Sequence, residues 1–310
     1  MIRAGAAALA LASLVVLAAG GAAAAPPAAP LAVVATSRDL QALVEAVGGG
    51  RVVVDSLASP QQDPHAIEIK PAQLALLRSA ALLVRVGLDH EPWLGRALAT
   101  LGPAAPGGTR DLDLSRTVAL LQTETPRLRA EAAPHAHGFG NPHYWLDPEN
   151  ARAMTAAIAA ALGRLAPTAR DEFDARRRHF LERLDAGLLR WRAALTPYHG
   201  ARVVTLHDTW TYFAARFGLT IAATVEPTPG VPPSPAALGA LVTRMRTAGV
   251  RVLIAEPFAD PSLVHAVAAR SGARAVTLVP SVGGEPGAGD YLALFDLNVA
   301  RLAAALEAAR

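Results

Sequence analysis

Hydrophobic and polar positions follow a regular rhythm along the N-terminal part of the chain. Short apolar runs predict buried strands at residues 31–36, 51–55 and 81–86. The segments between them, residues 39–47 and 71–79, carry apolar side chains at helical spacing and predict helices. Strands that alternate with helices are typical of a parallel sheet with helices packed on its faces.

The rhythm returns in the C-terminal part. Before it, residues 102–134 are rich in Pro, Gly and Thr without a clear period, so we expect a loop with short pieces of structure. From residue 202 onward the pattern predicts a second set of strands and helices. The strands are expected at residues 202–206, 221–225, 252–255 and 273–278, and the helices at residues 210–217, within 232–248, at 262–270 and at 291–309.

Two helical segments lie between these parts. Residues 148–165 predict an Ala-rich helix, and residues 168–195 predict a long amphipathic helix with a charged face. At ~1.5 Å per residue the second helix is about 40 Å long, and its midway position suits a rod that connects two domains. The sequence therefore predicts the α/β class, with two similar lobes, each a parallel sheet with covering helices, bridged by one long central helix.

The N-terminus has the pattern of an export signal. Arg3 is followed by an uncharged run with Leu and Val at its centre and small residues at its end, before Pro26. This order is typical of a secretory signal peptide, and the apolar part is short for the alternative, a retained anchor of about 20 residues. We expect a periplasmic protein with no stable membrane insertion after signal cleavage. The predicted division is residues 1–25 signal peptide, 26–165 N-terminal lobe, 166–197 linking helix and 198–310 C-terminal lobe.

Charge and cysteine content narrow the functional classes. The chain has 29 Lys and Arg against 26 Asp and Glu, and Lys70 is its only Lys. Because the basic side chains are scattered rather than clustered, we expect no binding of nucleic acid. Without Cys the chain forms no disulfide and carries no thiol for lipid attachment.

Histidine is the residue type that points to specific chemistry. The chain has nine His, and three of them, His135, His137 and His143, lie within fourteen positions. His65 and His207 each follow a predicted strand, at the edge where parallel sheets bind ligands. Neutral imidazole is a good ligand for Zn²⁺ and related ions. We therefore expect His65, His143 and His207 to bind a metal ion, although each one alone is also typical of a hydrogen-bonded loop His.

Carboxylates beside these residues are candidates to orient the rings. Asp63, Asp147 and Asp208 can accept a hydrogen bond from the ring nitrogen that does not bind metal and so set the tautomer. Helix capping and loop solvation explain them equally well. His135 and His137 are interpreted as a fringe that binds metal loosely or is simply solvated. The remaining histidines are interpreted as structural or surface residues, and they are His90, His179, His199 and His265.

Short motifs are distributed along the whole mature chain. They are Asp63-Pro64-His65, Val86-Gly87-Leu88, Glu91-Pro92-Trp93-Leu94, Asn141-Pro142-His143-Tyr144-Trp145-Leu146-Asp147-Pro148, His207-Asp208, Phe217-Gly218-Leu219, Glu256-Pro257 and Tyr291-Leu292. Each motif alone is unspecific. In this order and spacing they resemble the periplasmic solute-binding proteins of zinc and manganese ABC transporters.

The resemblance implies a fold and a set of ligands. The family has two α/β lobes bridged by one long helix, with the metal in the cleft between them. Its first two ligands fall on His65 and His143 and its third on His207, and His rather than Glu at the third place favours zinc over manganese. Many members have Asp as a fourth ligand, but this position falls at Val279, which cannot coordinate a metal. Water or a nearby carboxylate would complete the shell, and Glu256 is a candidate.

The functional hypothesis is high-affinity periplasmic binding of Zn²⁺, with Mn²⁺ as the less favoured cargo, and delivery to the membrane permease of an ABC transporter. We expect a monomeric binding protein and not an enzyme. The main alternative is a zinc-dependent hydrolase that uses a three-His site with an open water position. The sequence contains neither a His-Glu-x-x-His helix nor a Ser nucleophile elbow. A surface protein that binds the metal only structurally is a further alternative.

Overall fold

The computed structural model describes residues 29–62, 64–65, 67–122, 140–227 and 231–310. Within these ranges the chain forms two four-stranded sheets, and all neighbouring strands are parallel. The first sheet has the order β2-β1-β3-β4 and the second the order β6-β5-β7-β8. The strands are β1 Leu31–Ala35, β2 Val52–Ser56, β3 Leu82–Arg85, β4 Asp111–Asp113, β5 Arg202–Thr205, β6 Thr220–Thr224, β7 Val252–Ala255 and β8 Arg274–Thr277.

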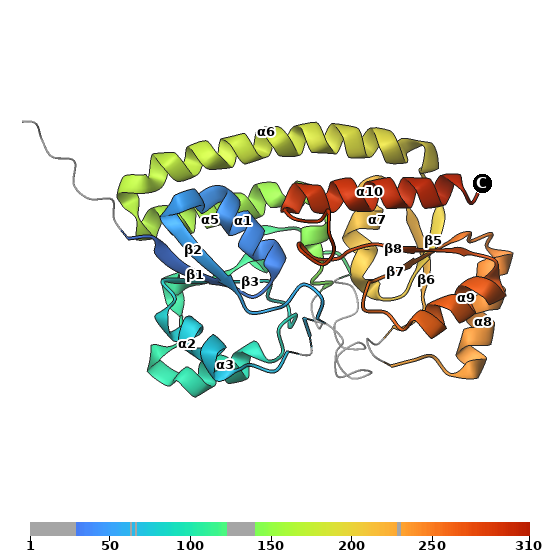
Figure 1. Cartoon of the computed structure of the whole chain (residues 1–310), viewed down its shortest axis with the longest axis horizontal. Helices are drawn as coiled ribbons and strands as arrows, with labels where there is room; N and C mark the ends of the chain where they lie inside the picture. Colours follow the sequence, from blue (N-terminus) through green and yellow to red (C-terminus); the bar gives the residue numbers. More distant parts are fainter. Residues whose placement is uncertain (1–28, 63, 66, 123–139, 228–230) are drawn as a thin grey trace, which may run out of the picture.

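Helices cover both sheets, and the longest of them, α6 (Arg170–Leu195), runs along both lobes (Figure 1). The predicted fold class, two parallel-sheet lobes bridged by a long central helix, is confirmed. The pattern missed the short helix α3, and β4 is one of the short pieces of structure expected within residues 102–134. The other helices are α1 Arg38–Gly48, α2 Pro71–Ser79, α3 Leu94–Leu101, α5 Ala151–Leu165, α7 Thr211–Phe217, α8 Pro235–Thr247, α9 Pro261–Ser271 and α10 Tyr291–Glu307.

The hydrophobic core continues from one lobe to the other beneath α6. Phe173 and Trp191 are buried on one face of this helix, which packs against α1, α5 and α10. Trp191 also donates from Nε1 to Asp296 Oδ1 of α10 at 2.7 Å. One connected cluster of buried residues includes Val33 of the first sheet and Val203 of the second. Because each buried large apolar side chain contributes about 1.5–3 kcal/mol, this shared core stabilises one arrangement of the lobes.

The segment of residues 141–147, called the junction segment below, contains one short 3₁₀ helix, Tyr144–Leu146, and is hydrogen-bonded to both lobes. Towards the first sheet, Tyr144 Oη donates to Val86 O, just beyond β3, at 2.7 Å. Towards the second sheet, Tyr212 Oη of α7 donates to Asn141 O at 2.8 Å. All four residues are buried. Since an unsatisfied buried polar group costs about 1–3 kcal/mol, these bonds stabilise the segment only while both lobes are in place.

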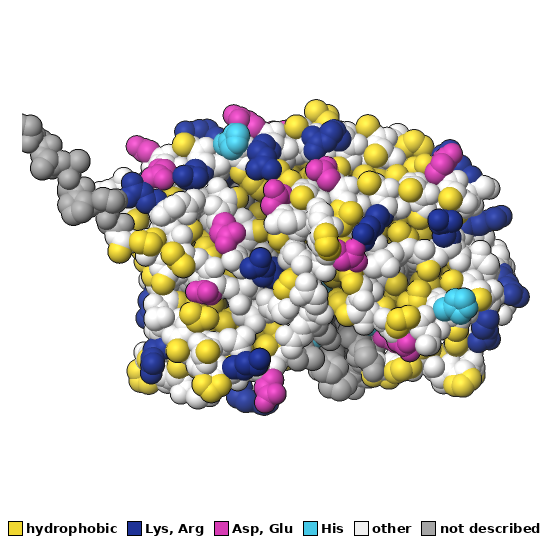
Figure 2. All heavy atoms as spheres, viewed as in Figure 1, with side chains coloured by type: hydrophobic (Ala, Val, Ile, Leu, Met, Phe, Trp, Pro, Cys, Tyr) yellow, Lys and Arg dark blue, Asp and Glu magenta, His cyan; other side chains and the backbone are white. Residues whose placement is uncertain are grey.

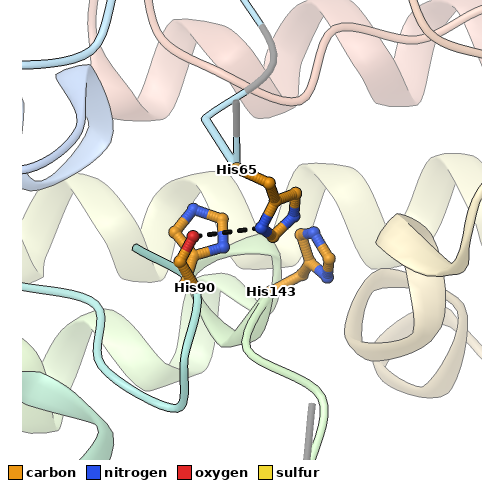
Figure 3. A group of neighbouring side chains, drawn as sticks. All are labelled: His65, His90 and His143. Atoms are coloured by element: carbon orange, nitrogen blue, oxygen red, sulfur yellow. Dashed lines mark hydrogen bonds between the residues drawn. The ribbon is translucent and has the colours of Figure 1, made fainter. Parts of the chain in front are cut away.

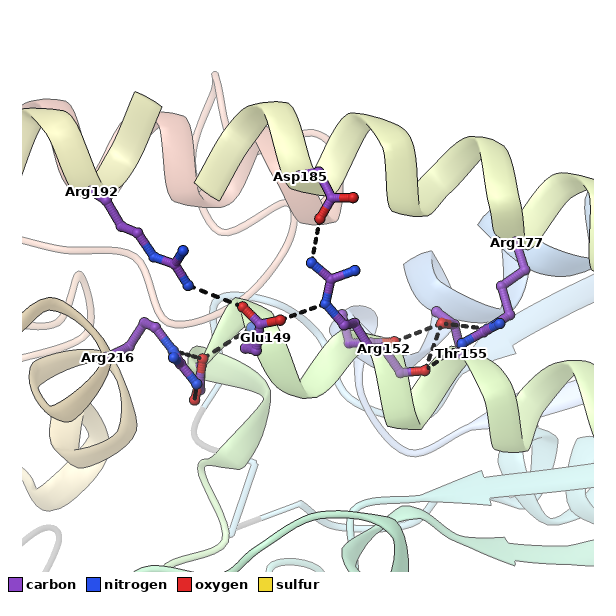
Figure 4. A network of polar contacts seen from close by, with 9 residues as sticks. Glu149, Arg152, Thr155, Arg177, Asp185, Arg192 and Arg216 are labelled. Atoms are coloured by element: carbon purple, nitrogen blue, oxygen red, sulfur yellow. Dashed lines mark hydrogen bonds and ion pairs between the residues drawn. The ribbon is translucent and has the colours of Figure 1, made fainter. Parts of the chain in front are cut away.

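An ion pair fastens the end of the junction segment to α7. Arg216 donates from Nε to Asp147 Oδ1 at 2.6 Å and from Nη2 to Asp147 Oδ2 at 2.7 Å. The Asp147 side chain is 12% exposed and the Arg216 side chain 29% exposed. Arg192 of α6 reaches the same region but pairs with Glu149 at 3.2 Å on a more open surface (Figure 4).

We expect Arg216→Ala to lower the free energy of unfolding by roughly 2–3 kcal/mol, because it leaves the mostly buried Asp147 carboxylate without its partner. The matched control is Arg192→Ala, which removes an exposed ion pair and should change stability by less than about 1 kcal/mol. Urea denaturation of both variants in the presence of a chelator measures the difference. Equal losses in the two variants would show that Arg216 does not stabilise the junction.

A buried carboxylate, Asp39, joins the start of α1 to the segment that leads into α10. Asp39 Oδ2 accepts a hydrogen bond from Ser281 Oγ at 2.8 Å, and Oδ1 accepts one from Val282 N at 2.9 Å. Burial raises the pKa of the Asp39 carboxyl from 3.8 to about 6, although the two hydrogen bonds lower it. Between these two pH values the folded protein therefore holds a proton that the unfolded chain has released.

The free energy of unfolding should fall through Asp39 as the pH rises from about 4 to about 6, by about 3 kcal/mol in total. The native state binds more protons than the unfolded state in this range, so the slope of stability with pH is negative. Asp39→Asn removes the titrating group and keeps an acceptor for the backbone. The difference in unfolding free energy between wild type and variant, measured by urea titration across this range, should change by that amount. A constant difference would contradict the assignment.

Candidate metal site

Three histidines, His65, His90 and His143, converge at the carboxyl edge of the first sheet (Figure 3). Each offers a ring nitrogen, and these nitrogens lie within 4.8 Å of one another. The ring centroids are 4.5 Å apart for His65 and His90, 5.6 Å for His90 and His143, and 5.8 Å for His65 and His143. Nitrogens bound tetrahedrally to one zinc ion are about 3.4 Å apart, so small movements bring this group to a metal.

His65 lies in the loop that follows β2. Its Nδ1 is 3.0 Å from the carbonyl oxygen of His90. Because a carbonyl can only accept, Nδ1 carries the proton, and Nε2 is the nitrogen with a lone pair for a metal. The preceding residue is also fixed, since Trp93 Nε1 donates to Pro64 O at 2.8 Å. Two hydrogen bonds thus hold the His65 loop against the loop that follows β3.

His90 ends a tight turn that begins at the end of β3. Gly87, Leu88 and Asp89 all have positive φ, of 78°, 56° and 56°, and His90 N donates to Gly87 O at 3.0 Å. A Cβ at Gly87 would also collide with the Asp113 carboxylate, so only glycine fits there. Leu88 and Asp89 adopt a conformation that costs of order 1 kcal/mol each, and strain of this kind is concentrated at functional sites. The turn directs His90 inward, where it is 1% exposed.

A buried carboxylate maintains this turn. Glu91 Oε1 accepts hydrogen bonds from Thr36 Oγ1 at 2.5 Å and Val86 N at 2.7 Å, and Oε2 accepts one from Gly87 N at 3.0 Å. Burial raises the pKa of the Glu91 carboxyl to about 7, while the hydrogen bonds lower it. Glu91 therefore satisfies the backbone of the turn that positions His90.

His143 belongs to the junction segment. Asn141 Oδ1 accepts hydrogen bonds from His143 N and from His143 Nδ1, both at 2.9 Å. The Asn141 amide oxygen thus selects the Nδ1-protonated tautomer, as the His90 carbonyl does for His65. Trp145 packs beside the group, with its ring 5.0 Å from that of His90 and 5.3 Å from that of His143. The tilted Trp145 ring limits the access of water to this side of the cluster.

His207 follows β5 in the other lobe. Its ring nitrogens do not belong to the group whose members lie within 4.8 Å of one another. Its Nδ1 is 3.6 Å from Glu226 Oε2. A short polar connection nevertheless leads from it to the cluster, because Asn141 Nδ2 donates to Asp208 O at 2.8 Å. Of the three predicted ligands, the structure thus brings His65 and His143 together and places His207 across the junction from them.

The remaining predicted residues are three carboxylates and the two histidines of the fringe. Asp147 caps the short helix that follows it and pairs with Arg216, and it bonds to no histidine among the described residues. Asp208 accepts from the side chains of Gln122, through Nε2 at 3.1 Å, and Thr211, through Oγ1 at 2.8 Å. Asp63, His135 and His137 lie outside the described residues.

Val279 and Glu256 bear on the missing fourth ligand. Val279 is fully buried, and its backbone N and O are both hydrogen-bonded to the Asn298 side chain, at 2.8 and 2.7 Å. This position is therefore part of the core. Glu256 follows β7, is 2% exposed, and accepts from Trp210 Nε1 at 2.9 Å. It lies beside His207 in the C-terminal lobe rather than beside the three clustered histidines.

His90 is the functional candidate that the sequence prediction missed. It was grouped with His179, His199 and His265, which are indeed exposed. The signal that distinguishes His90 is its place, since it follows the strand at residues 81–86 at the same sheet edge as His65.

The visible surface carries charges of both signs. Dark blue basic and magenta acidic side chains are interspersed over the face in Figure 2, in agreement with the scattered basic residues of the sequence. Within the described ranges, none of the helices combines the length and the apolar composition that a membrane crossing requires.

Two parallel-sheet lobes, a connecting helix and a histidine cluster at the strand ends define a bilobed metal-binding protein. A family model described as the periplasmic component A of the zinc-uptake complex, ZnuA, matches residues 33–305. The chain belongs to this family of solute-binding proteins. Membership does not support the hydrolase alternative.

Individual relatives agree with this assignment. The chain is 30% identical, over 286 aligned positions, to the high-affinity zinc uptake system protein ZnuA of Paracoccus denitrificans, covering 82% of this chain and 85% of the relative. A crystal structure of ZnuA is similar with a TM-score of 0.74 and 26% identity, covering 89% of this chain and 99% of that one. The solute-binding protein FpvC of Pseudomonas aeruginosa in complex with Mn²⁺ is similar with a TM-score of 0.78 and 25% identity, covering 90% and 99%.

If His90 is a ligand, His90→Ala should weaken zinc binding by more than the roughly 10–100-fold that loss of a supporting hydrogen bond costs. The control is His179→Ala, since the His179 side chain is 73% exposed and lies on α6. Competition with a chromophoric chelator measures both dissociation constants. Unchanged affinity in the His90 variant would show that this residue only packs beside the site.

Proposed function

We propose that this chain binds Zn²⁺ in the periplasm and delivers it to the membrane permease of an ABC transporter. The observation that supports this function is the convergence of His65, His90 and His143. Three neutral imidazoles supply the nitrogen ligands that Zn²⁺ takes in tetrahedral sites. Mn²⁺ prefers oxygen ligands, so a site of this composition favours zinc over manganese.

His207 is our candidate for the fourth ligand. It lies at the carboxyl end of β5, next to Asp208, whose carbonyl is bonded to the Asn141 side chain that also holds His143. A metal bound by His207 and by the three N-terminal histidines would join the two lobes. A small shift of the loop that carries any one of these residues would leave three ligands of four, and the incomplete shell would favour transfer of the metal to a permease.

The proposed location rests on the N-terminal segment and on the family. Residues 1–25 have the order of a secretory signal peptide, and the family model is described as periplasmic. A monomeric protein of this kind meets its cargo outside the cytoplasm and its permease at the membrane surface.

The function is tested by titrating the metal-free mature protein with Zn²⁺ and with Mn²⁺ at neutral pH. We expect one tightly bound zinc ion per chain and weaker binding of Mn²⁺. His143→Ala should lower zinc affinity by more than roughly 100-fold, because it removes a metal ligand and not only a supporting bond. His199→Ala, a change at an exposed residue, is the matched control.

The absence of tight zinc binding, or an affinity that is unchanged by His143→Ala, would contradict the proposed function. Tight zinc binding that is lost in His65→Ala and His143→Ala but unchanged in His207→Ala would place the site entirely in the N-terminal lobe.

A further inference from the structure

Three ionisable residues meet at the carboxyl edge of the second sheet. His207 follows β5, Glu226 follows β6 and Glu256 follows β7. Because β5 lies between β6 and β7, the histidine is placed between the two carboxylates. The backbone pairing of β5 with β6 continues to this edge, since Glu226 N donates to Leu206 O, immediately before His207, at 2.8 Å.

The two carboxylates are buried and have few hydrogen-bond or ion-pair partners. Glu226 is 7% exposed and Glu256 is 2% exposed. In the described part of the chain, Glu226 has one ion-pair partner, His207, and Glu256 Oε2 has no hydrogen-bond partner. Burial raises the pKa of the Glu256 carboxyl, and the nearby His207 lowers it. Buried carboxylates require a positive or hydrogen-bonding partner, and His207 is the group that faces both.

The orientation of the His207 ring follows from its exposure. Its Nδ1 is fully buried and has no hydrogen bond within the described ranges, yet the side chain as a whole is 12% exposed. The exposed part of the ring therefore lies away from Nδ1. Nδ1 lies 3.6 Å from Glu226 Oε2, slightly beyond hydrogen-bond length.

Two of the three clustered histidines in the other lobe have a hydrogen-bond acceptor at Nδ1. His65 Nδ1 faces the His90 carbonyl, and His143 Nδ1 faces the Asn141 amide oxygen. In each case an acceptor behind the ring leaves Nε2 as the nitrogen for the metal. A metal on His207 Nε2 likewise requires the remaining ring proton to be on Nδ1, and Glu226 is the acceptor available for it.

We propose that Glu226 is the positioning residue that presents His207 as the fourth metal ligand, with Glu256 on the other side of the ring. This rests on the proposed function. When Zn²⁺ is bound to His207 Nε2, the 3.6 Å contact between Nδ1 and Glu226 Oε2 contracts to a hydrogen bond. Glu256 keeps its bond with Trp210 and contributes a second negative charge next to the metal-bound ring.

The test is a double-mutant cycle with the mature protein and Zn²⁺ in competition with a chromophoric chelator. We expect Glu226→Gln to weaken zinc binding by about 10–100-fold, as is typical when an outer hydrogen-bond partner of a ligand is lost. His207→Ala should weaken it at least as much. In the His207→Ala background, Glu226→Gln should have no further effect, because Glu226 acts through His207.

Four further measurements make the outcome specific. Glu285→Gln changes a carboxylate that pairs with Arg301 away from the histidines and should leave affinity unchanged. Thermal unfolding without metal shows that each variant folds, and Glu226→Asp, which keeps the carboxylate, should recover part of the affinity. Co²⁺ in place of Zn²⁺ should give the strong visible absorption of four-coordinate cobalt in wild type and a weaker or altered spectrum in Glu226→Gln and His207→Ala.

The proposal is overturned if Glu226→Gln leaves affinity and the cobalt spectrum unchanged, or if its effect is as large in the His207→Ala background as in wild type. These results differ from a failure of the proposed function, which would appear as weak zinc binding in wild type or as unchanged binding in His143→Ala.

Discussion

The hydrogen bonds of the junction segment, residues 141–147, are divided between two lobes that each have their own sheet. A segment with only one short helical turn satisfies few of its own polar groups, so a buried loop of this kind needs donors and acceptors from its surroundings. The Asn141 side chain shows the division best. Its Oδ1 holds His143, and its Nδ2 bonds to Asp208 O in the other lobe. The placement of His143, a proposed metal ligand, and the arrangement of the lobes therefore depend on the same side chain.

The rest of the structure restricts how far the lobes can separate. The shared core beneath α6 and the ion pair between Asp147 and Arg216 both oppose a wide opening. A hinge that opened the site fully would expose apolar surface and leave buried polar groups unsatisfied. Small shifts of the loops that carry His65 and His90 would exchange the metal at a lower cost in free energy, because these loops lie outside the junction segment.

Most of the fold was predictable from the sequence because its strands are short apolar runs and most of its helices carry apolar side chains at helical spacing. Helix α3 was missed because it begins just after Pro92 and contains Gly95. His65 and His143 were predicted from their places at strand and loop ends. His90 has a similar place after a strand, but its direction depends on positive φ at Leu88 and Asp89, which the sequence does not specify.

A second limit concerns partners that are distant in the sequence. Asp147 was a candidate to orient a histidine because it lies four positions from His143, and helix capping explained it equally well. In the structure it pairs with Arg216, which is 69 positions away. Spacing along the chain indicates which residues share a loop, but the choice between two nearby partners depends on packing of elements that the local sequence does not specify.

The loss of the expected fourth ligand has an electrostatic consequence. An Asp at position 279 would have neutralised part of the charge of a divalent ion, whereas Val279 belongs to the core and the clustered ligands are neutral imidazoles. A site made of His65, His90, His143 and His207 leaves the full charge of the metal on the complex. Two buried carboxylates, Glu226 and Glu256, lie beside His207 without a Lys or Arg partner among the described residues. Buried charges are stable only when they are compensated. The positive charge of the bound metal would compensate the two carboxylates, and the carboxylates would compensate the metal. Glu226 and Glu256, beside the His207 ring, thus supply the negative charge that the ligand shell lacks.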